Sequence, residues 1–195
     1  NQLLNFPRVD FGPSVAIDRR AGLQDALDAH PDVVVVGEVD GNFVRDTSQT
    51  VFESLWQGHP DITGVWAANG GTATGVMAAI TNAGKVPGKD LMVVGMDLNP
   101  ENVEAVESGQ LLFDIGGHWL QGGFALVTMY DYLNGHKVAA DQANIKLALL
   151  PLTKDLVAKF KTDFPGGVPV YDFKAHSQTY NPEAKSAVFE MKYSQ

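Results

Sequence analysis

Polar and aromatic side chains follow the predicted strands at the points where these strands end. The residues are Phe43, Asn69, Asp97, His118, Trp119 and Gln121. An asparagine amide both donates and accepts hydrogen bonds, a carboxylate accepts from two hydroxyl groups, and an aromatic ring offers a flat apolar wall for C–H groups. Since ligands of open α/β sheets bind outside the carboxyl ends of the strands, this pattern predicts a site for a sugar-like molecule.

The two strongest candidates also fit purely structural roles. Asn69 precedes Gly70, as a turn residue often does. Asp97 lies shortly before a predicted helix, where an acid stabilises the helix N-terminus. The local sequence leaves both interpretations open for each residue.

The other candidates have similar alternatives. His118 also fits a structural histidine, and the rings of Phe43 and Trp119 can serve packing. Arg19 and Arg20 lie near the start of a predicted helix, and we expect at least one of them to be simply solvated.

Patterns that would indicate catalysis or metal binding are absent from the sequence. The chain has no Cys, no G-x-S-x-G motif and no glycine-rich phosphate loop. Its five histidines are scattered, with no pair at the spacing of metal ligands. We therefore expect a binding protein and not an enzyme, with no catalytic residue, no metal and no cofactor.

Bulk composition narrows the class of partner. The 195 residues are 45% hydrophobic and carry a net charge of −9, which disfavours nucleic-acid binding. The longest apolar runs are strand-sized and too short to span a membrane. The first residues do not resemble a signal peptide, but the sequence lacks an initiating Met and says little about the compartment.

Predicted strands and helices alternate along the chain. Strands are expected at residues 33–36, 62–68, 91–96, 111–115 and 145–151. Helices are expected at residues 18–30, 46–58, 72–83, 120–133 and 156–164, with another that begins at Pro100 and closes at Ser108-Gly109. This alternation predicts an α/β fold with a doubly wound parallel sheet and right-handed crossovers.

Four finer predictions concern single segments. The apolar runs at 33–36 and 91–96 predict strands buried in the sheet, the first on both faces. Thr72 is expected to cap its helix. Gly116-Gly117 is expected to be a flexible joint. The tail after residue 165 has no clear period, and we expect its aromatic residues Tyr171, Phe173, Tyr180, Phe189 and Tyr193 to pin it to the body.

Several motifs together resemble a known family. Residues 67–75 (AANGGTATG), 93–100 (VVGMDLNP) and 106–111 (VESGQL) are similar to type I periplasmic sugar-binding proteins of the ribose-binding-protein-like kind. Residues 19–23 (RRAGL) and 43–45 (FVR) extend the match. The resemblance covers roughly residues 13–160, and its motifs also occur in ligand-sensing domains of lactose-repressor-like regulators.

The resemblance implies a role for each of four residues. Arg19 would hydrogen-bond ligand hydroxyls, and Phe43 would stack on a ring. Asn69 and Asp97 would bind hydroxyls from the strand ends. Their spacing, matched to the family as a set, favours the ligand-binding interpretation over the structural one.

The sequence departs from the family at two of its site positions. Gly117 stands where the family often has Gln, so that contact is lost or is replaced by His118, Trp119 or Gln121. Gly70 stands where an acid often follows the Asn. These departures put ribose itself in doubt as the ligand.

The resemblance also implies a division of the chain. Residues 1–116 would form the carboxyl-side lobe, 117–150 a hinge crossing with a helix and strand that complete the other lobe, and 151–195 a return segment and tail. The first lobe would be largely missing. The apolar segment 120–150 would then need a partner, which we expect to be the missing lobe, a separate segment or an oligomer partner.

The function implied is that of the solute-binding component of a bacterial ABC importer. It would bind a sugar or related polyol between two lobes that close by a hinge, act in the periplasm and deliver to a membrane permease. One alternative is the ligand-sensing domain of a transcriptional regulator, which carries a DNA-binding headpiece. Another is a periplasmic sensor for a membrane receptor.

Overall fold

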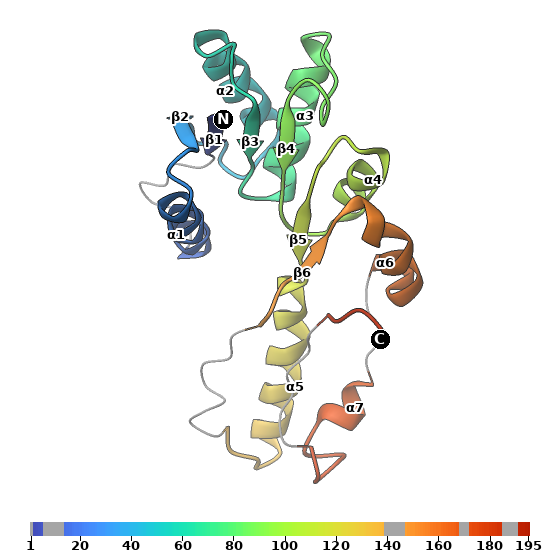
Figure 1. Ribbon diagram of the computed structural model, residues 1–195. Coiled ribbons are helices and arrows are strands. Elements are labelled where there is room, and N and C mark those ends of the chain that lie inside the picture. Colours follow the sequence, from blue (N-terminus) through green and yellow to red (C-terminus); the bar gives the residue numbers. More distant parts are fainter. Residues whose placement is uncertain (1, 6–13, 139–146, 168–171, 185–190) are drawn as a thin grey trace. The chain divides into compact units, whose positions relative to one another are not determined.

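The structure is a computed structural model that describes residues 2–5, 14–138, 147–167, 172–184 and 191–195 (Figure 1). The chain divides into two compact units. The first contains residues 1–115 and 152–157, and the second contains residues 116–151 and 158–195.

A four-stranded sheet forms the centre of the first unit. Its strands are β1 (Gln2–Asn5), β2 (Val34–Glu38), β3 (Gly64–Trp66) and β4 (Met92–Val94). They are ordered β2-β1-β3-β4, and every pair is parallel, which confirms the predicted sheet type. The sequence interpretation missed β1, because four residues are too few to show a period.

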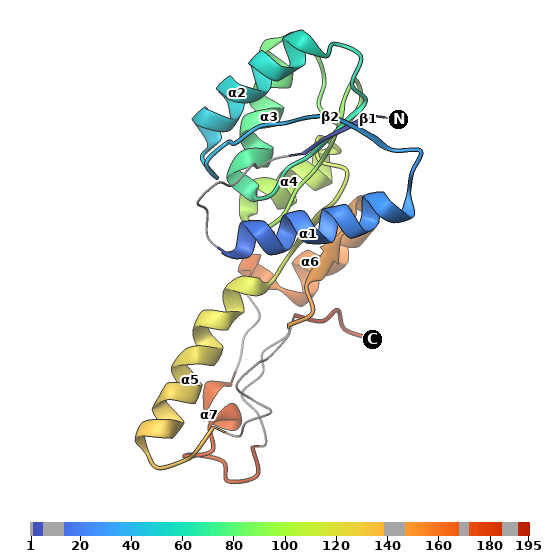
Figure 2. The ribbon, with the colours of Figure 1, turned by 90° about the vertical axis from the view of Figure 1, so that its left-hand side faces the viewer.

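Four helices accompany this sheet: α1 (Ser14–Ala29), α2 (Arg45–Gly58), α3 (Gly70–Asn82) and α4 (Pro100–Ser108). Figure 2 shows α2 and α3 lying side by side, with α1 separate from that pair. Phe52 of α2 and Ile80 of α3 are fully buried together with Val65 and Val93 of the sheet. Apolar side chains of these helices and strands therefore form the core of the unit.

Two predictions about single strands are wrong in part. Val34 and Val35 are 53% and 38% exposed, so β2 is not buried on both faces. β2 lies at an edge of the sheet, and a continuous apolar run alone does not distinguish an edge strand from a central one. In β4, Val93 is fully buried, but Met92 is exposed.

The helix boundaries follow local capping chemistry. The cap predicted at Thr72 is wrong, because Asn69 caps α3 with its side chain and Thr72 lies inside the helix. Pro100 opens α4 as predicted, and Gly109 ends it in the left-handed conformation that glycine adopts easily.

The strands β5 (Asp114–Gly116) and β6 (Leu150–Leu152) form a separate two-stranded sheet. Each of these strands contains a boundary between the two units, after Ile115 and after Pro151. The strand predicted at 111–115 thus begins later, although Phe113 forms an isolated parallel bridge with Val94 of β4. Of the strand predicted at 145–151, residues 145 and 146 lie outside the described residues.

The remaining elements are short apart from one helix. They are η1 (His118–Leu120), α5 (Gln121–Leu133), η3 (Lys154–Leu156), α6 (Val157–Asp163), η4 (Pro165–Gly167) and α7 (Phe173–His176). Among the described helices, none is long and apolar enough to cross a membrane.

A buried carboxylate fastens the tail to α5 inside the second unit. Asp131 accepts hydrogen bonds from the hydroxyl groups of Ser177 and Thr179, at 2.5 and 2.7 Å, and from the N–H groups of Gln178 and Thr179. Burial opposes the charge of this carboxylate, but these donors lower the pKa of Asp131 to about 2. A carboxylate with this many donors is a strong local anchor.

Aromatic residues hold the tail at two further points. Tyr180 stacks on Tyr130 of α5 with ring centroids 5.6 Å apart. The Tyr193 hydroxyl donates to the carbonyl of Pro151 at 2.8 Å. The prediction that aromatic residues pin the tail is confirmed for these two tyrosines, whereas Tyr171 and Phe189 lie outside the described residues.

Candidate ligand-binding site at the strand ends

The segment after β4 has an unusual backbone in residues 95–98, which we call the Asp97 corner. The N–H of Asp97 donates to the Ile115 carbonyl at 2.8 Å, which continues the parallel pairing beyond β4. Asp97 has φ 120° and Leu98 has φ 55°, a region that L-residues rarely occupy. Such a backbone persists only where neighbouring groups hold it in place.

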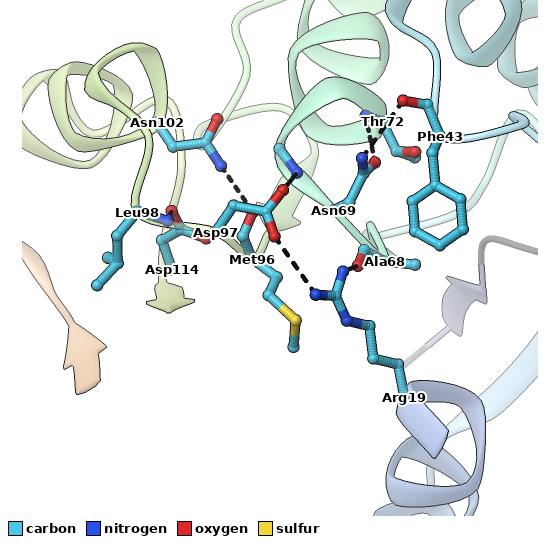
Figure 3. A network of polar contacts seen from close by, with 11 residues as sticks. Arg19, Phe43, Ala68, Asn69, Thr72, Met96, Asp97, Leu98, Asn102 and Asp114 are labelled. Carbon is cyan, nitrogen blue, oxygen red and sulfur yellow. Dashed lines mark hydrogen bonds and ion pairs between the residues drawn. The ribbon is translucent and has the colours of Figure 1, made fainter. Parts of the chain in front are cut away.

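The Asp97 carboxylate is the centre of a polar network (Figure 3). Its Oδ2 accepts from the N–H of Gly70, the first residue of α3, at 2.8 Å. Its Oδ1 lies 3.5 Å from Nη2 of Arg19, which comes from α1. Nη1 of Arg19 donates to the carbonyl of Ala68, just after β3, at 2.6 Å. Three distant segments of the chain therefore meet at this carboxylate.

The ion pair between Arg19 and Asp97 is mostly buried but still accessible, with side chains 11% and 25% exposed. Burial lowers the pKa of Arg19, while the Asp97 charge raises it. The separation of 3.5 Å exceeds the roughly 2.7–2.9 Å of a tight charge-assisted hydrogen bond. A hydroxyl group could therefore accept from the guanidinium and donate to the carboxylate at the same time.

Asn69 joins the start of α3 to the loop that carries Phe43. Its Oδ1 accepts from the N–H of Thr72 at 2.8 Å, and its Nδ2 donates to the carbonyl of Phe43 at 3.3 Å. The structural role considered for Asn69 is thus present. An amide oxygen has two lone pairs and an amide nitrogen two hydrogens, so each of these contacts uses half of what its atom offers.

Phe43 is half-buried in a loop of unusual conformation. Asn42 and Phe43 have φ values of 52° and 56°. The backbone of Phe43 also needs a glycine opposite, because a Cβ at Gly71 would lie 2.8 Å from the Phe43 carbonyl. The Phe43 ring lies beside Asn69 (Figure 3). Contacts with Asn69 and Gly71 hold the loop in this conformation.

The structural role proposed for Asp97 is different from the observed one. Asn99, not Asp97, caps α4, and its side chain accepts from the N–H of Asn102. Asp97 instead faces the N-terminus of α3 through Gly70. The neighbouring arginine is also engaged: Arg20 donates to both carboxylate oxygens of Glu38, at 2.8 and 2.9 Å, so the expectation of a simply solvated arginine is wrong.

The two glycine departures from the family pattern have physical reasons. A Cβ at Gly70 would lie 2.2 Å from Nδ2 of Asn99 and 3.3 Å from Oδ2 of Asp97, so a side chain there would displace the Asn99 side chain that caps α4. Gly117 has φ 100°, and a Cβ at this position would lie 3.1 Å from the sulfur of Met191. Both positions favour glycine in this protein.

Three of the seven predicted site residues lie in the second unit. His118 and Trp119 belong to η1, and both are half-buried. Gln121 opens α5 and is exposed. Their part in a common site with the first unit stays a prediction. Among the described residues, no group of three or more His, Asp or Glu side chains could hold a metal ion.

Sequence interpretation missed a polar pair behind the Asp97 corner. Asp114 of β5 is fully buried, and its Oδ2 accepts from the N–H of Leu98 at 3.0 Å. Nδ2 of Asn102, also fully buried, donates to the carbonyl of Met96 at 3.3 Å. The sequence does contain one signal for this pair: an acidic residue, Asp114, stands between Phe113 and Ile115 in an apolar predicted strand.

Comparison with protein families gives a match over most of the first unit and part of the second. Residues 9–137 match the model of the periplasmic binding protein domain. The ribose import binding protein of Salmonella typhimurium is 36% identical over 130 residues, which are 66% of this chain and 43% of that protein. The galactofuranose-binding protein of Escherichia coli is 32% identical over 102 residues, which are 51% of this chain and 32% of that protein.

Solved structures resemble the whole described fold. A periplasmic sugar-binding protein from Pseudomonas fluorescens superposes with a TM-score of 0.82 at 29% identity, over 97% of this chain and 58% of that one. The binding protein component of the arabinose ABC transporter from Shewanella, solved with L-arabinofuranose, gives a TM-score of 0.73 at 27% identity, over 80% and 52% of the two chains. The chain thus spans about half the length of the proteins it matches.

Proposed function

The chain belongs to the periplasmic binding protein domain family and has the type I fold of its sugar-binding members, and on that premise we propose that it is part of the solute-binding component of a bacterial ABC importer. The proposed ligand is a sugar or related polyol. The observation that carries the proposal is the Arg19–Asp97 ion pair at the strand ends, with Asn69 and Phe43 beside each other in the same unit.

Each proposed binding group makes a different kind of contact with the ligand. Arg19 donates to a ring or hydroxyl oxygen, and Asp97 accepts from hydroxyl groups. Asn69 uses the second donor and the second lone pair of its amide, and Phe43 stacks on the C–H face of the sugar. This set of contacts suits a neutral polyhydroxylated molecule, and it fits the ligands after which the relatives are named: ribose, galactofuranose and arabinofuranose.

The proposal extends to partners and compartment. Relatives named as import binding proteins support a membrane permease as the partner and the periplasm as the compartment. His118, Trp119 and Gln121 are proposed to contribute further contacts from the second unit. Because the relatives have about twice the length, the remaining lobe is proposed to cover the exposed apolar residues of α5, among them Leu133 at 77% exposure.

A sugar screen tests the proposed function. The full protein is mixed with D-ribose, L-arabinose, D-galactose and myo-inositol, and its thermal unfolding temperature is recorded. We expect at least one compound to raise this temperature by several degrees, since a ligand that binds only the folded state stabilises it. No response to any sugar or polyol would contradict the proposal, and so would a helix-turn-helix segment encoded upstream.

Substitution of the central carboxylate tests the site. Asp97→Ala is expected to weaken binding of the sugar found in the screen by about 10- to 100-fold, because hydrogen bonds to a charged group contribute about 1.5–3 kcal/mol. Isothermal titration calorimetry measures this change. Asp25→Ala, an exposed acid on α1, is the matched control and should bind as the unchanged protein does. Equal affinities in all three proteins would show that the site lies elsewhere.

A further inference from the structure

Asp114 is a buried carboxyl group to which the proposed binding function assigns no task. It lies on β5, its side chain is fully buried, and its Oδ2 accepts from the N–H of Leu98 at 3.0 Å. Leu98 has φ 55° and follows Asp97, which has φ 120°. The carboxyl group of Asp114 thus holds the strained backbone that aims Asp97 at Gly70 and Arg19 (Figure 3).

Two buried oxygens beside the Asp97 corner have no donor. They are Oδ1 of Asp114 and Oδ1 of Asn102. Both side chains approach Gly95, where a Cβ would lie 3.3 Å from Nδ2 of Asn102 and 3.3 Å from Oδ1 of Asp114. A buried acceptor without a donor costs free energy. A proton on the Asp114 carboxyl would remove the negative charge that its buried Oδ1 would otherwise carry without a donor.

We propose that Asp114 is a positioning residue for the Asp97 corner. Its carboxyl group must carry a proton for the corner to keep this geometry. Sugar binding therefore weakens when the proton is lost. The affinity part of this inference rests on the proposed function. Asp114 itself touches no ligand in this scheme and acts through Leu98 and Asp97.

The surroundings of Asp114 favour the protonated form near neutral pH. Burial raises the pKa of Asp114 to about 7. The Asn102 side chain and the N–H groups of Leu98 and Ile115 lower it, and the charge of Asp97 raises it. Asn102 comes from α4, Ile115 from β5 itself, and Leu98 and Asp97 from the corner. Asp97 is the charged group among them, and it repels a second negative charge.

Loss of the proton would disturb the corner for an electrostatic reason. An ionised Asp114 would hold a desolvated charge that its donors, the Leu98 N–H among them, do not offset. Displacement of the corner would let water reach that charge and would separate it from the Asp97 carboxylate. The same displacement would move Asp97 away from Gly70 and Arg19, and would thus disrupt the site.

A measurement without any sugar tests the positioning role directly. Two-dimensional ¹H–¹⁵N NMR spectra of the full protein are recorded between pH 5.5 and 8.5. The N–H of Leu98 reports on Asp114, and the N–H of Gly70 reports on Asp97. We expect both resonances to shift with one common midpoint near pH 7 in the unchanged protein, and neither to shift there in Asp114→Asn.

Asp114→Asn is the suitable variant because its amide resembles the protonated carboxyl group. The amide oxygen can accept from the N–H of Leu98, and the amide carries no charge over the pH range of the experiment. Asp114→Thr is a second variant, whose hydroxyl also donates and accepts. A Gly70 resonance without a midpoint between pH 6 and 8 in the unchanged protein, or the same midpoint in both variants, would overturn the proposal.

Affinity provides the functional readout. If only the protonated protein binds, the dissociation constant for the compound that binds in the screen of D-ribose, L-arabinose, D-galactose and myo-inositol should rise about tenfold from pH 6 to pH 8, because the competent fraction falls. Asp114→Asn should bind with an affinity independent of pH. An equal pH dependence in both proteins would refute the role of Asp114. If none of the four screened compounds binds at any pH, the proposed function fails, and the NMR experiment still decides whether Asp114 positions Asp97.

Discussion

At the scale of single residues, three aspartates show how surroundings decide what a carboxyl group does. Asp131 has four hydrogen-bond donors, which lower its pKa to about 2 despite burial. Asp114 is also buried, but burial dominates there and raises its pKa to about 7. Asp97 is partly exposed and faces a guanidinium. Residue type alone predicted neither the anchor in the tail nor the buried acid behind the site.

The raised pKa of Asp114 predicts how stability depends on pH. The unfolded chain ionises this group near pH 3.8, whereas the folded chain keeps the proton up to about pH 7. Its contribution to stability is therefore fully present below pH 3.8 and is lost as the pH rises to 7. At about 1.4 kcal/mol per pH unit, the loss is on the order of 4 kcal/mol.

Urea unfolding from pH 4 to pH 7.5 measures this loss. Asp114→Asn should show a smaller fall in the free energy of unfolding over that range than the unchanged protein. Asp25→Asn, at an exposed position, should follow the unchanged protein. If Asp114→Asn keeps the full slope, the carboxyl group does not retain its proton in the folded state.

Much of the candidate site could be predicted from the sequence at this scale. Phe43, Asn69 and Asp97 follow predicted strands, and Arg19 is indicated by the family resemblance. The structure brings all four into one unit. Their role in binding stays a prediction. Asp114 and Asn102 were missed, because their importance depends on which backbone groups the fold brings to them.

At the scale of elements, the pairing of α2 and α3 depends on one glycine. A Cβ at Gly75 would lie 2.3 Å from the carbonyl oxygen of Arg45 and 3.0 Å from the N–H nitrogen of Gln49. Both are backbone atoms, which cannot move without shifting the whole helix. The start of α3, with Asn69 as its cap, is therefore placed against the Phe43 loop by close backbone contact.

This contact predicts opposite effects for two glycine substitutions. Gly75→Ala should destabilise the protein by about 1–3 kcal/mol, because the extra methyl group forces α2 and α3 apart. Gly22→Ala in α1 is the matched control, since no other element lies within 4 Å of its added Cβ. It should stabilise the protein by up to about 1 kcal/mol through helix propensity. Chemical denaturation gives both values, and a stabilising Gly75→Ala would contradict the close packing.

At the scale of the whole molecule, α5 carries large apolar residues that remain exposed to solvent. Leu126, Met129 and Leu133 recur at helical spacing on α5, and all three are exposed. The chain spans 43% of the ribose import binding protein and 58% of the similar solved structure. An exposed apolar stripe of this kind marks an interface.

The stripe predicts association of the 195-residue chain by itself. We expect analytical ultracentrifugation to detect concentration-dependent self-association and a hydrophobic dye to bind. Serine at Leu126, Met129 and Leu133 together should reduce both effects, because the apolar area is then lost. Val86→Ser, at an exposed apolar residue of the first unit, should change neither. A monomer without dye binding would contradict the prediction.

The sequence by itself determined the features that depend on neighbours along the chain. The alternation of strands and helices, the proline and glycine that bound α4, and the polar residues at strand ends are local patterns, and local hydrogen bonding produces them. The tertiary structure alone decided that β2 is an edge strand and that Asp97 faces α3 and not α4. It also decided that Asp114 is buried behind the site. The burial of a side chain and the charges around it depend on which distant segments of the chain come into contact. A local sequence pattern does not contain that information.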